Sequence, residues 1–297
     1  MRRRFFLIDN ATAGYGPRLL APRVVGCLER AGATVTRGRS RTKEDAYGLA
    51  FEAARSGGYD AILAAGGDGT IRQAARALAD TGMPLGVIPV GTANVLSHEI
   101  GLPHGPQDLA DVLLRAPAVT IRAPTVNGEL FLLMAGAGFD GRVIDALSHP
   151  IKSRIGKLAY AAPVLGALAR APDALDLEID GRPHRAAWAV IANARHYGGA
   201  FVIAEGARLH DPGLSAVLFD AAERRALLAC LIALASGRLS TCRYVRVVPC
   251  RQVEIRSRAV VPVQVDGDAF GSTPVTVASD GPRVSLIMPL PASAGRG

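Results

Sequence analysis

The chain has 297 residues, 49% of them hydrophobic and 20% charged, which is typical of a packed globular protein with two domains. Its formal net charge of +8 indicates a partner such as an anionic membrane surface, a nucleotide or a nucleic acid. Before residue 150 no aromatic side chain is interleaved with the basic clusters as a base-stacking surface requires, so we expect no nucleic-acid partner. The four cysteines form no Cys-x-x-Cys pair, which argues against a zinc site and fits reduced thiols in a cytoplasmic protein.

The first part of the sequence alternates between strand and helix patterns. The expected strands are 4–9, 34–36, 59–65 and 84–90, and the expected helices are 18–31, 43–56 and 71–79. This rhythm is typical of a parallel sheet with helices on both faces, in which ligands bind at the carboxyl ends of the strands. We therefore predict an α/β domain over residues 1–122.

Near residue 123 the pattern changes to short alternating segments separated by Asp-Gly turns. The expected strands are 130–135, 175–180, 187–192, 214–219, 244–248, 253–257, 261–265, 274–278 and 284–288, with helices at 151–170 and 221–236. This predicts an antiparallel β-sandwich domain over 123–290, whose last strand, near 283–290, can return to the first domain. The tail 291–297 is expected to be disordered, and the apolar run Ala226 to Ser236 is too short to span a membrane.

A glycine-rich loop, residues 66–70, follows the expected strand 59–65 and leads into a helix. Its glycines let the backbone approach a bulky anion, and the helix amino terminus supplies unpaired N–H groups. Asp68 beside a polyphosphate requires a bridging cation, usually Mg²⁺, and the Thr70 hydroxyl can contact phosphate or cap the helix. The alternative is an ordinary strand-to-helix turn. No Walker A motif is present, so this is not a P-loop protein.

Two further loops are expected at the same edge of the sheet. One follows the first strand, from Asn10 to Gly14, and the other is Gly91-Thr92-Ala93-Asn94. Thr92 and Asn94 suit phosphate or ribose contacts, although both could equally cap the next helix. Three polar strand-end loops converging on one crevice predict a nucleotide site more strongly than any one of them.

A Gly-x-Gly-x-x-Gly motif occurs at 136–141 and invites a dinucleotide-binding interpretation. The acidic residue expected about twenty positions later is missing, and the motif lies in the β-rich half of the chain. We therefore do not expect a nicotinamide site there.

Five segments, in this order, resemble the diacylglycerol kinase catalytic-domain family, which includes bacterial lipid kinases and sphingosine kinases. They are Gly66-Gly67-Asp68-Gly69-Thr70, Gly91-Thr92-Ala93-Asn94, Gly136 to Asp140, Asn193 with Tyr197-Gly198-Gly199, and Asp266-Gly267-Asp268. The resemblance covers nearly the whole chain. It implies a nucleotide domain like those of phosphofructokinase and NAD kinase, followed by a β-sandwich. It also implies an ATP- and Mg²⁺-dependent transfer of the γ-phosphate to a lipid hydroxyl.

The resemblance further implies the site residues. Asp266 and Asp268 would form a catalytic acidic pair with Asp266 as the base, and Asp68 and Asp211 would be metal ligands. With Asn94 added, the residues expected to line the nucleotide are Asn10, Ala11, Thr12, Ala13, Gly14, Ser40, Gly66, Gly67, Asp68, Gly69, Thr70, Ile71, Arg72, Thr92 and Asn94. Without the resemblance, Asp266-Gly267 would be interpreted as a simple hairpin turn.

The chain departs from the family pattern at Val95, usually Asp, at Asp268, usually Glu, and at the Asp211-Pro212-Gly213 turn. Two alternatives stay open. One is an NAD kinase-like nucleotide kinase, because NAD kinases share a Gly-Gly-Asp-Gly loop, and the other is a non-catalytic nucleotide- or lipid-binding protein, which the replacements at Val95 and Asp268 allow. For the favoured lipid kinase we expect a cytoplasmic protein that contacts anionic membrane through the basic and apolar segment 151–170. That segment could instead be a packing helix. A homodimer is compatible with the sequence, and no motif names the lipid.

Overall fold

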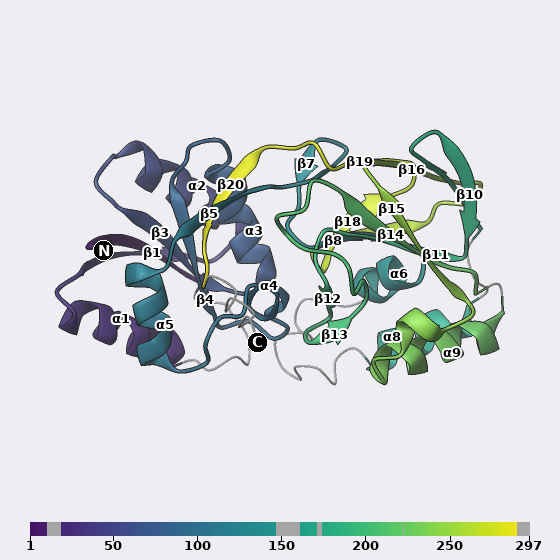
Figure 1. Ribbon diagram of the computed structural model, residues 1–297, viewed down its shortest axis with the longest axis horizontal. Coiled ribbons are helices and arrows are strands. Elements are labelled where there is room, and N and C mark those ends of the chain that lie inside the picture. Colours follow the sequence, from purple (N-terminus) through teal and green to yellow (C-terminus); the bar gives the residue numbers. More distant parts are fainter. Residues whose placement is uncertain (11–18, 147–160, 171–173, 222, 290–297) are drawn as a thin grey trace, which may run out of the picture. The chain divides into compact units, whose positions relative to one another are not determined.

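The computed structural model describes residues 1–10, 19–146, 161–170, 174–221 and 223–289 (Figure 1). The chain forms two compact units, one of Met1–Ile121 with the segment from Arg283 onward, the other of Arg122–Pro282. The boundary expected after residue 122 lies next to the one observed. The tail 291–297, expected to be disordered, lies outside the described residues.

The first unit is built on one sheet with the strand order β2-β1-β3-β4-β20-β5. The strands are β1 (Arg4–Asn10), β2 (Thr34–Ser40), β3 (Ala61–Gly66), β4 (Pro84–Pro89), β5 (Ala118–Arg122) and β20 (Arg283–Ile287). β1 pairs in parallel with β2 and β3, and β4 pairs in parallel with β3 and β20. Parallel pairing brings the carboxyl ends of β1, β3 and β4 to one edge, which confirms the predicted α/β architecture.

The helices of this unit are α1 (Leu20–Arg30), α2 (Lys43–Arg55), α3 (Asp68–Ala77), α4 (Val95–Glu99) and α5 (Pro106–Arg115). α1 buries the predicted apolar face, including Val24, Val25 and Leu28. α2 starts at a capping box, in which the Thr42 hydroxyl and the Asp45 carboxylate accept each other's backbone N–H. α5 was not predicted, although a proline at its start is a helix signal.

The second unit contains two six-stranded sheets whose paired strands are antiparallel. The first, in spatial order, is β10 (Arg182–Ala186), β9 (Leu175–Ile179), β16 (Gln252–Ser257), β19 (Val275–Ala278), β6 (Thr125–Val126) and β7 (Glu129–Leu130). The second is β15 (Val245–Cys250), β14 (Leu214–Phe219), β11 (Trp188–Ala192), β8 (Met134–Ala137), β17 (Pro262–Val265) and β18 (Asp268–Ser272).

Buried side chains from both sheets form a single apolar cluster, for example Leu177 and Val277 from one sheet and Ile191 and Val263 from the other. One core shared by two antiparallel sheets is the signature of a sandwich, so this prediction is confirmed. The predicted strand 130–135 is wrong in its bounds. Residues 131–133 form a loop between β7 and β8. The Phe131 N–H donates to the Pro124 carbonyl, and the N–H groups of Leu132 and Leu133 donate to a buried side chain described below.

A 3₁₀ helix, Leu239–Thr241, precedes β15. Three α-helices and a short ribbon complete the second unit among the described residues. They are α6 (Phe139–Asp145), α8 (Ala161–Ala169), α9 (Arg224–Ala235), and the ribbon of β12 (His196–Tyr197) with β13 (Phe201–Val202). Figure 1 shows α8 and α9 side by side, and the two helices are in contact. Of the predicted helix 151–170, only the part from residue 161 lies within the described residues. No helix in the described parts of the chain has the length and hydrophobicity needed to cross a membrane.

Candidate active site

The β3–α3 loop has the local geometry of an anion site. Gly66 is required because a Cβ at this position would lie 2.5 Å from the Cβ of Thr70, which folds back over the loop. α3 starts at Asp68, and its N-cap residue Gly67 has extended backbone without a side-chain cap. The first N–H groups of a helix have no partner within the helix and carry the positive end of its dipole. The amino terminus of α3 can therefore receive a phosphate.

The β4–α4 loop packs directly against the β3–α3 loop. A Cβ on Gly91 would lie 2.4 Å from the Cα of Gly67, so position 91 needs glycine for this approach. Asn94, in the left-handed region at φ 48°, turns its side chain back onto its own loop. Its Oδ1 accepts from the Gly91 N–H at 2.8 Å, and its Nδ2 donates to the Gly91 carbonyl at 2.9 Å. The Asn94 amide thus shapes the loop, and α4 is capped by another residue.

That residue is Asp68. Its Oδ2 accepts the Val95 N–H and its Oδ1 accepts the Leu96 N–H, each at 3.0 Å. The two hydrogen bonds fix the carboxylate across both loops and use about half of its lone pairs. Mg²⁺ that arrives on a polyphosphate keeps several waters and needs only one or two protein carboxylates. The partly exposed Asp68 fits that role, directly or through water.

The end of β1 is tied to the same loops. The Asn10 amide Nδ2 donates to Thr70 Oγ1 at 2.7 Å. The predicted contacts Ala11, Thr12, Ala13 and Gly14 lie outside the described residues. Asn10 and Thr70 thus lie together, as the convergence of the three loops requires.

The remaining predicted nucleotide contacts differ in accessibility. Ser40, at the end of β2, is buried, and its hydroxyl has no hydrogen-bond partner among the described residues. Ile71 and Arg72 are buried on α3, whereas Gly69 and Thr92 are partly exposed. Among these residues, the backbone of the loops is thus better placed to contact a ligand than the side chains of Ser40 and Ile71.

The Asp-Gly-Asp segment forms the two-residue turn of the β17–β18 hairpin, with Asp266 at φ 50° and Gly267 at φ 80°. The hairpin interpretation and a functional one are therefore compatible. Asp266 is 7% exposed, and its carboxylate accepts three backbone N–H groups from the β7–β8 loop. Its Oδ2 accepts from Leu132 at 2.8 Å, and its Oδ1 accepts from Leu133 at 2.9 Å and Met134 at 3.0 Å.

Asp268, the first residue of β18, is partly exposed. The two carboxylates of the turn are thus in different situations. Asp266 is buried with most of its acceptor capacity in use, and Asp268 can be reached from solvent.

The other predicted metal ligand, Asp211, lies in an exposed turn before β14. Its side chain is 46% exposed, with Oδ1 3.8 Å from the Nε2 of His210. Among the described residues no three His, Cys, Asp or Glu side chains are grouped as a metal site would need. The role of Asp211 therefore stays a prediction.

The Gly-x-Gly-x-x-Gly motif has a structural explanation in the second unit. A Cβ on Gly136 would lie 1.9 Å from Asp140 Oδ2, and a Cβ on Gly141 would lie 2.1 Å from the Pro262 carbonyl. The glycines make room for a buried carboxylate and for a neighbouring strand. Sequence reasoning missed Asp140 and its partner Gln264 as polar residues near the Asp-Gly-Asp turn, because no spacing signal brings residues 124 positions apart together.

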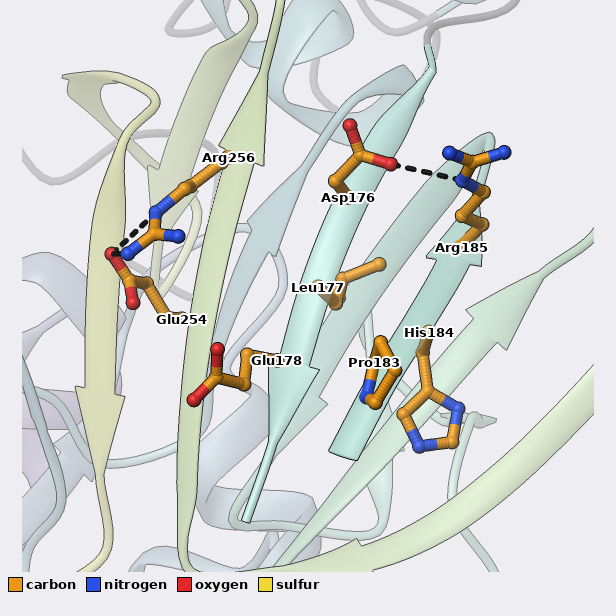
Figure 2. A pocket seen from close by; sticks show the side chains of 8 residues that line it. All are labelled: Asp176, Leu177, Glu178, Pro183, His184, Arg185, Glu254 and Arg256. Atoms are coloured by element: carbon orange, nitrogen blue, oxygen red, sulfur yellow. Dashed lines mark hydrogen bonds and ion pairs between the residues drawn. The ribbon is translucent and has the colours of Figure 1, made fainter. Parts of the chain in front are cut away.

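Figure 2 shows a hollow on the outer face of β9, β10 and β16 that contains none of the predicted site residues. It contains two ion pairs, Asp176 with Arg185 at 3.0 Å and Glu254 with Arg256 at 2.6 Å. These are solvent-exposed ion pairs of small energetic consequence.

Comparison with known proteins agrees with this geometry. Residues 4–126 match the diacylglycerol kinase catalytic domain, and residues 134–288 match the YegS C-terminal NAD kinase beta sandwich-like domain. The two matches define the class, an α/β kinase catalytic domain followed by an NAD kinase-like sandwich. The chain belongs to the diacylglycerol kinase family, which includes the YegS-like lipid kinases.

Similar proteins cover most of the chain. A Mycobacterium tuberculosis protein named diacylglycerol kinase is 28% identical over 293 residues, 95% of this chain and 94% of that one. A Pseudomonas fluorescens protein named "Probable lipid kinase YegS-like" is 32% identical over 230 residues, 75% of each chain. The crystal structure of a diacylglycerol kinase from Bacillus anthracis has the same fold, with a TM-score of 0.68 over 97% of both chains at 17% identity.

Proposed function

We propose that this protein is an ATP-dependent lipid kinase that transfers the γ-phosphate to a lipid hydroxyl. The observation that carries the proposal is the glycine-lined amino terminus of α3 with Asp68 fixed beside it, in a chain of the diacylglycerol kinase family. A phosphate-binding helix terminus and an adjacent metal-competent carboxylate are what phosphoryl transfer requires of a nucleotide site.

In this proposal each unit supplies part of the chemistry. The first N–H groups of α3 hold phosphate oxygens, and Asp68 holds Mg²⁺ on the polyphosphate. When bound, the ion neutralises the charge that develops on the phosphate oxygens. The acceptor hydroxyl needs a base within hydrogen-bond reach. The resemblance implied Asp266 as this base. Because Asp266 is buried and accepts three backbone N–H groups, whereas Asp268 is partly exposed, we instead propose Asp268 as the acceptor of the hydroxyl proton and give Asp266 the task of holding the turn in place.

The proposal is tested with labelled ATP and total lipid extract, followed by mass spectrometry of the labelled lipids. We expect label in a lipid with a free hydroxyl, such as diacylglycerol or a sphingoid base. Parallel reactions with NAD in place of the lipid extract test the alternative that the protein is a nucleotide kinase. Labelled NADP with unlabelled lipid would contradict the proposal, and so would ATP binding without any product.

A lipid kinase must meet its substrate at a membrane, and we propose that the α8–α9 face makes this contact. Leu165 of α8 is 67% exposed, and Leu228 and Ile232 of α9 are 49% and 60% exposed. Arg224 lies at the start of α9, where its guanidinium donates to the Ala169 carbonyl of α8. Apolar side chains with arginine beside them are suited to an anionic bilayer surface. The basic residues expected to assist, Lys152, Arg154 and Lys157, lie outside the described residues.

Replacing Leu228 and Ile232 together by serine is expected to reduce the fraction bound to anionic vesicles by about tenfold, because burial of each side chain contributes on the order of 1–2 kcal/mol. The measurement is sedimentation with phosphatidylglycerol-containing vesicles. Val260→Ser is the matched control, since Val260 is 82% exposed and lies in the loop before β17, outside these helices. Equal binding by the wild type and the double variant would contradict this surface.

A further inference from the structure

A buried chain of hydrogen bonds leads from α6 to the Asp-Gly-Asp turn. Asp140 is 2% exposed, and its Oδ2 accepts from Gln264 Nε2 at 2.9 Å. Gln264, also 2% exposed, accepts the Gly267 N–H on its Oε1 at 2.8 Å. Gly267 is the central residue of the turn, between Asp266 and Asp268. One carboxylate and one amide thus connect the helix to the backbone that carries the acidic pair.

The surrounding backbone is adapted to this connection. Gly136 has no Cβ at the place where the Asp140 carboxylate lies. The β17–β18 ladder shifts register next to Gln264: Val263 pairs with Gly271 and Gln264 with Ala269, so the extra residue, Phe270, lies on β18. The Gln264 side chain reaches both Asp140 and the turn from this position.

The direction of each hydrogen bond between Asp140, Gln264 and Gly267 is fixed. The Gly267 N–H can only donate, so Gln264 must present its oxygen to the turn and its NH₂ group to Asp140. The other oxygen of Asp140 accepts the Gly141 N–H at 2.9 Å, so both carboxylate oxygens must be acceptors. An asparagine at position 140 would offer one acceptor oxygen to two donors, the Gly141 N–H and the Gln264 NH₂ group. Whichever way the side-chain amides at positions 140 and 264 are turned, two N–H donors then face each other.

We propose that Asp140 and Gln264 are positioning residues that hold the Asp266-Gly267-Asp268 turn for phosphoryl transfer. The inference rests on the proposed kinase function. Asp266 anchors the turn to the β7–β8 loop through three backbone hydrogen bonds, and the Asp140–Gln264 pair anchors it to α6. A turn held from two elements keeps the Asp268 backbone fixed, and small displacements of catalytic groups cost turnover.

The test exchanges the carboxylate and the amide. Asp140→Asn and Gln264→Glu each break the pattern of hydrogen bonds. The first substitution places two donor groups opposite each other, and the second places two carboxylates opposite each other. In the double variant, the amide now at position 140 would donate to one oxygen of the carboxylate now at position 264. The second oxygen of that carboxylate would accept the Gly267 N–H, so every pair matches again, and the side chains keep their volume. Burial raises the pKa of Asp140 to about 6, against the opposing hydrogen bonds from Gln264 and Gly141, so Asp140 is ionised in the wild-type protein when the assays are run at pH 8.

We expect each single variant to lower kcat by about tenfold or more with the KM for ATP changed less than about twofold, and the double variant to recover most of the loss. Hydrogen–deuterium exchange of the peptide containing Gly267 gives a readout without catalysis: faster in each single variant, slow again in the double. Asp176→Asn, a carboxylate-to-amide change in the exposed pair of Figure 2, should alter neither quantity.

Wild-type kcat and exchange in both single variants would overturn the positioning role. A double variant whose kcat is no higher than the product of the two single effects predicts would also overturn the positioning role. A wild-type protein that phosphorylates no lipid would instead refute the proposed function, and the exchange pattern at Gly267 would still decide whether the pair holds the turn.

Discussion

Replacing Asp266 by asparagine is expected to lower turnover by about a hundredfold while ATP binding is retained, because the turn that carries Asp268 loses its anchor and a misplaced catalytic group is that costly. Asparagine tolerates the left-handed backbone at this position, so the turn itself is not strained. Its single oxygen cannot serve the three N–H groups of the β7–β8 loop, and at least the donor opposite Oδ2, the Leu132 N–H, is left unsatisfied. A buried unsatisfied donor costs about 1–3 kcal/mol of stability.

Two comparison variants separate chemistry from anchoring. Asp180 occupies an equivalent Asp-Gly turn at φ 47°, and its carboxylate accepts the N–H groups of Arg251 and Gln252. Because this turn is exposed and carries no proposed function, Asp180→Asn should lower the melting temperature modestly and leave turnover unchanged. Asp268→Asn should lower turnover by a similar factor to Asp266→Asn without loss of thermal stability, since Asp268 is partly exposed.

The measurements are steady-state kinetics, corrected for the folded fraction, and thermal unfolding of each variant. Wild-type turnover per folded molecule in Asp266→Asn would exclude a role of this residue in the reaction. Wild-type turnover in Asp268→Asn, with activity lost in Asp266→Asn, would reverse the two roles and make Asp266 the proton acceptor.

The second large effect is expected for Asp68→Ala. Loss of the carboxylate removes the proposed Mg²⁺ contact and the cap of α4, so MgATP affinity should fall by about 10–100-fold and stability by about 1 kcal/mol. Calorimetric titration with ATP, once with Mg²⁺ and once with EDTA, separates the loss of the Mg²⁺ contact from the loss of the α4 cap. The affinity for Mg²⁺-free ATP should change much less than the affinity for MgATP.

Asp45→Ala is the matched control within the same unit. The Asp45 carboxylate also accepts two backbone N–H groups, from Arg41 at 2.8 Å and Thr42 at 3.0 Å, and also secures the start of a helix. It should lose similar stability while the Mg²⁺ dependence of ATP binding is kept. An Asp68→Ala protein whose ATP affinity still rises normally with Mg²⁺ would show that Asp68 is only a helix cap.

The fold was largely predictable because its signals are local. The alternation of apolar strands such as 59–65 with amphipathic helices predicts a parallel sheet, and short strands with Asp-Gly turns predict an antiparallel one. Strand β10, Arg182–Ala186, was missed because its side chains are mostly polar and include Pro183, as is common at a sheet edge. The loop at 131–133 is apolar and buried like a strand, although the N–H groups of Leu132 and Leu133 bond to the Asp266 carboxylate and not to a neighbouring strand.

The candidate site was predictable at the level of loops and less so at the level of side-chain tasks. Glycine-rich strand ends are visible in the sequence, and the structure gives their close approach at Gly67 and Gly91. That Asp68 also caps α4, or that Asp266 is buried, depends on contacts between distant segments. No periodicity encodes such contacts. The hydrogen bond between Asp140 and Gln264 is another contact between segments that are distant in the sequence.

The return of the chain to its first sheet has a consequence for biosynthesis. β20 lies between β4 and β5, so β5 has no neighbour in that sheet until residues 283–287 have been made. On the ribosome the intervening residues 122–282 of the sandwich unit emerge before this gap can be filled, and they can fold first. Expression of the first unit alone, by truncation after residue 121, would leave the edge of β4 bare. A circular permutation that joins 283–289 to the first unit would restore it.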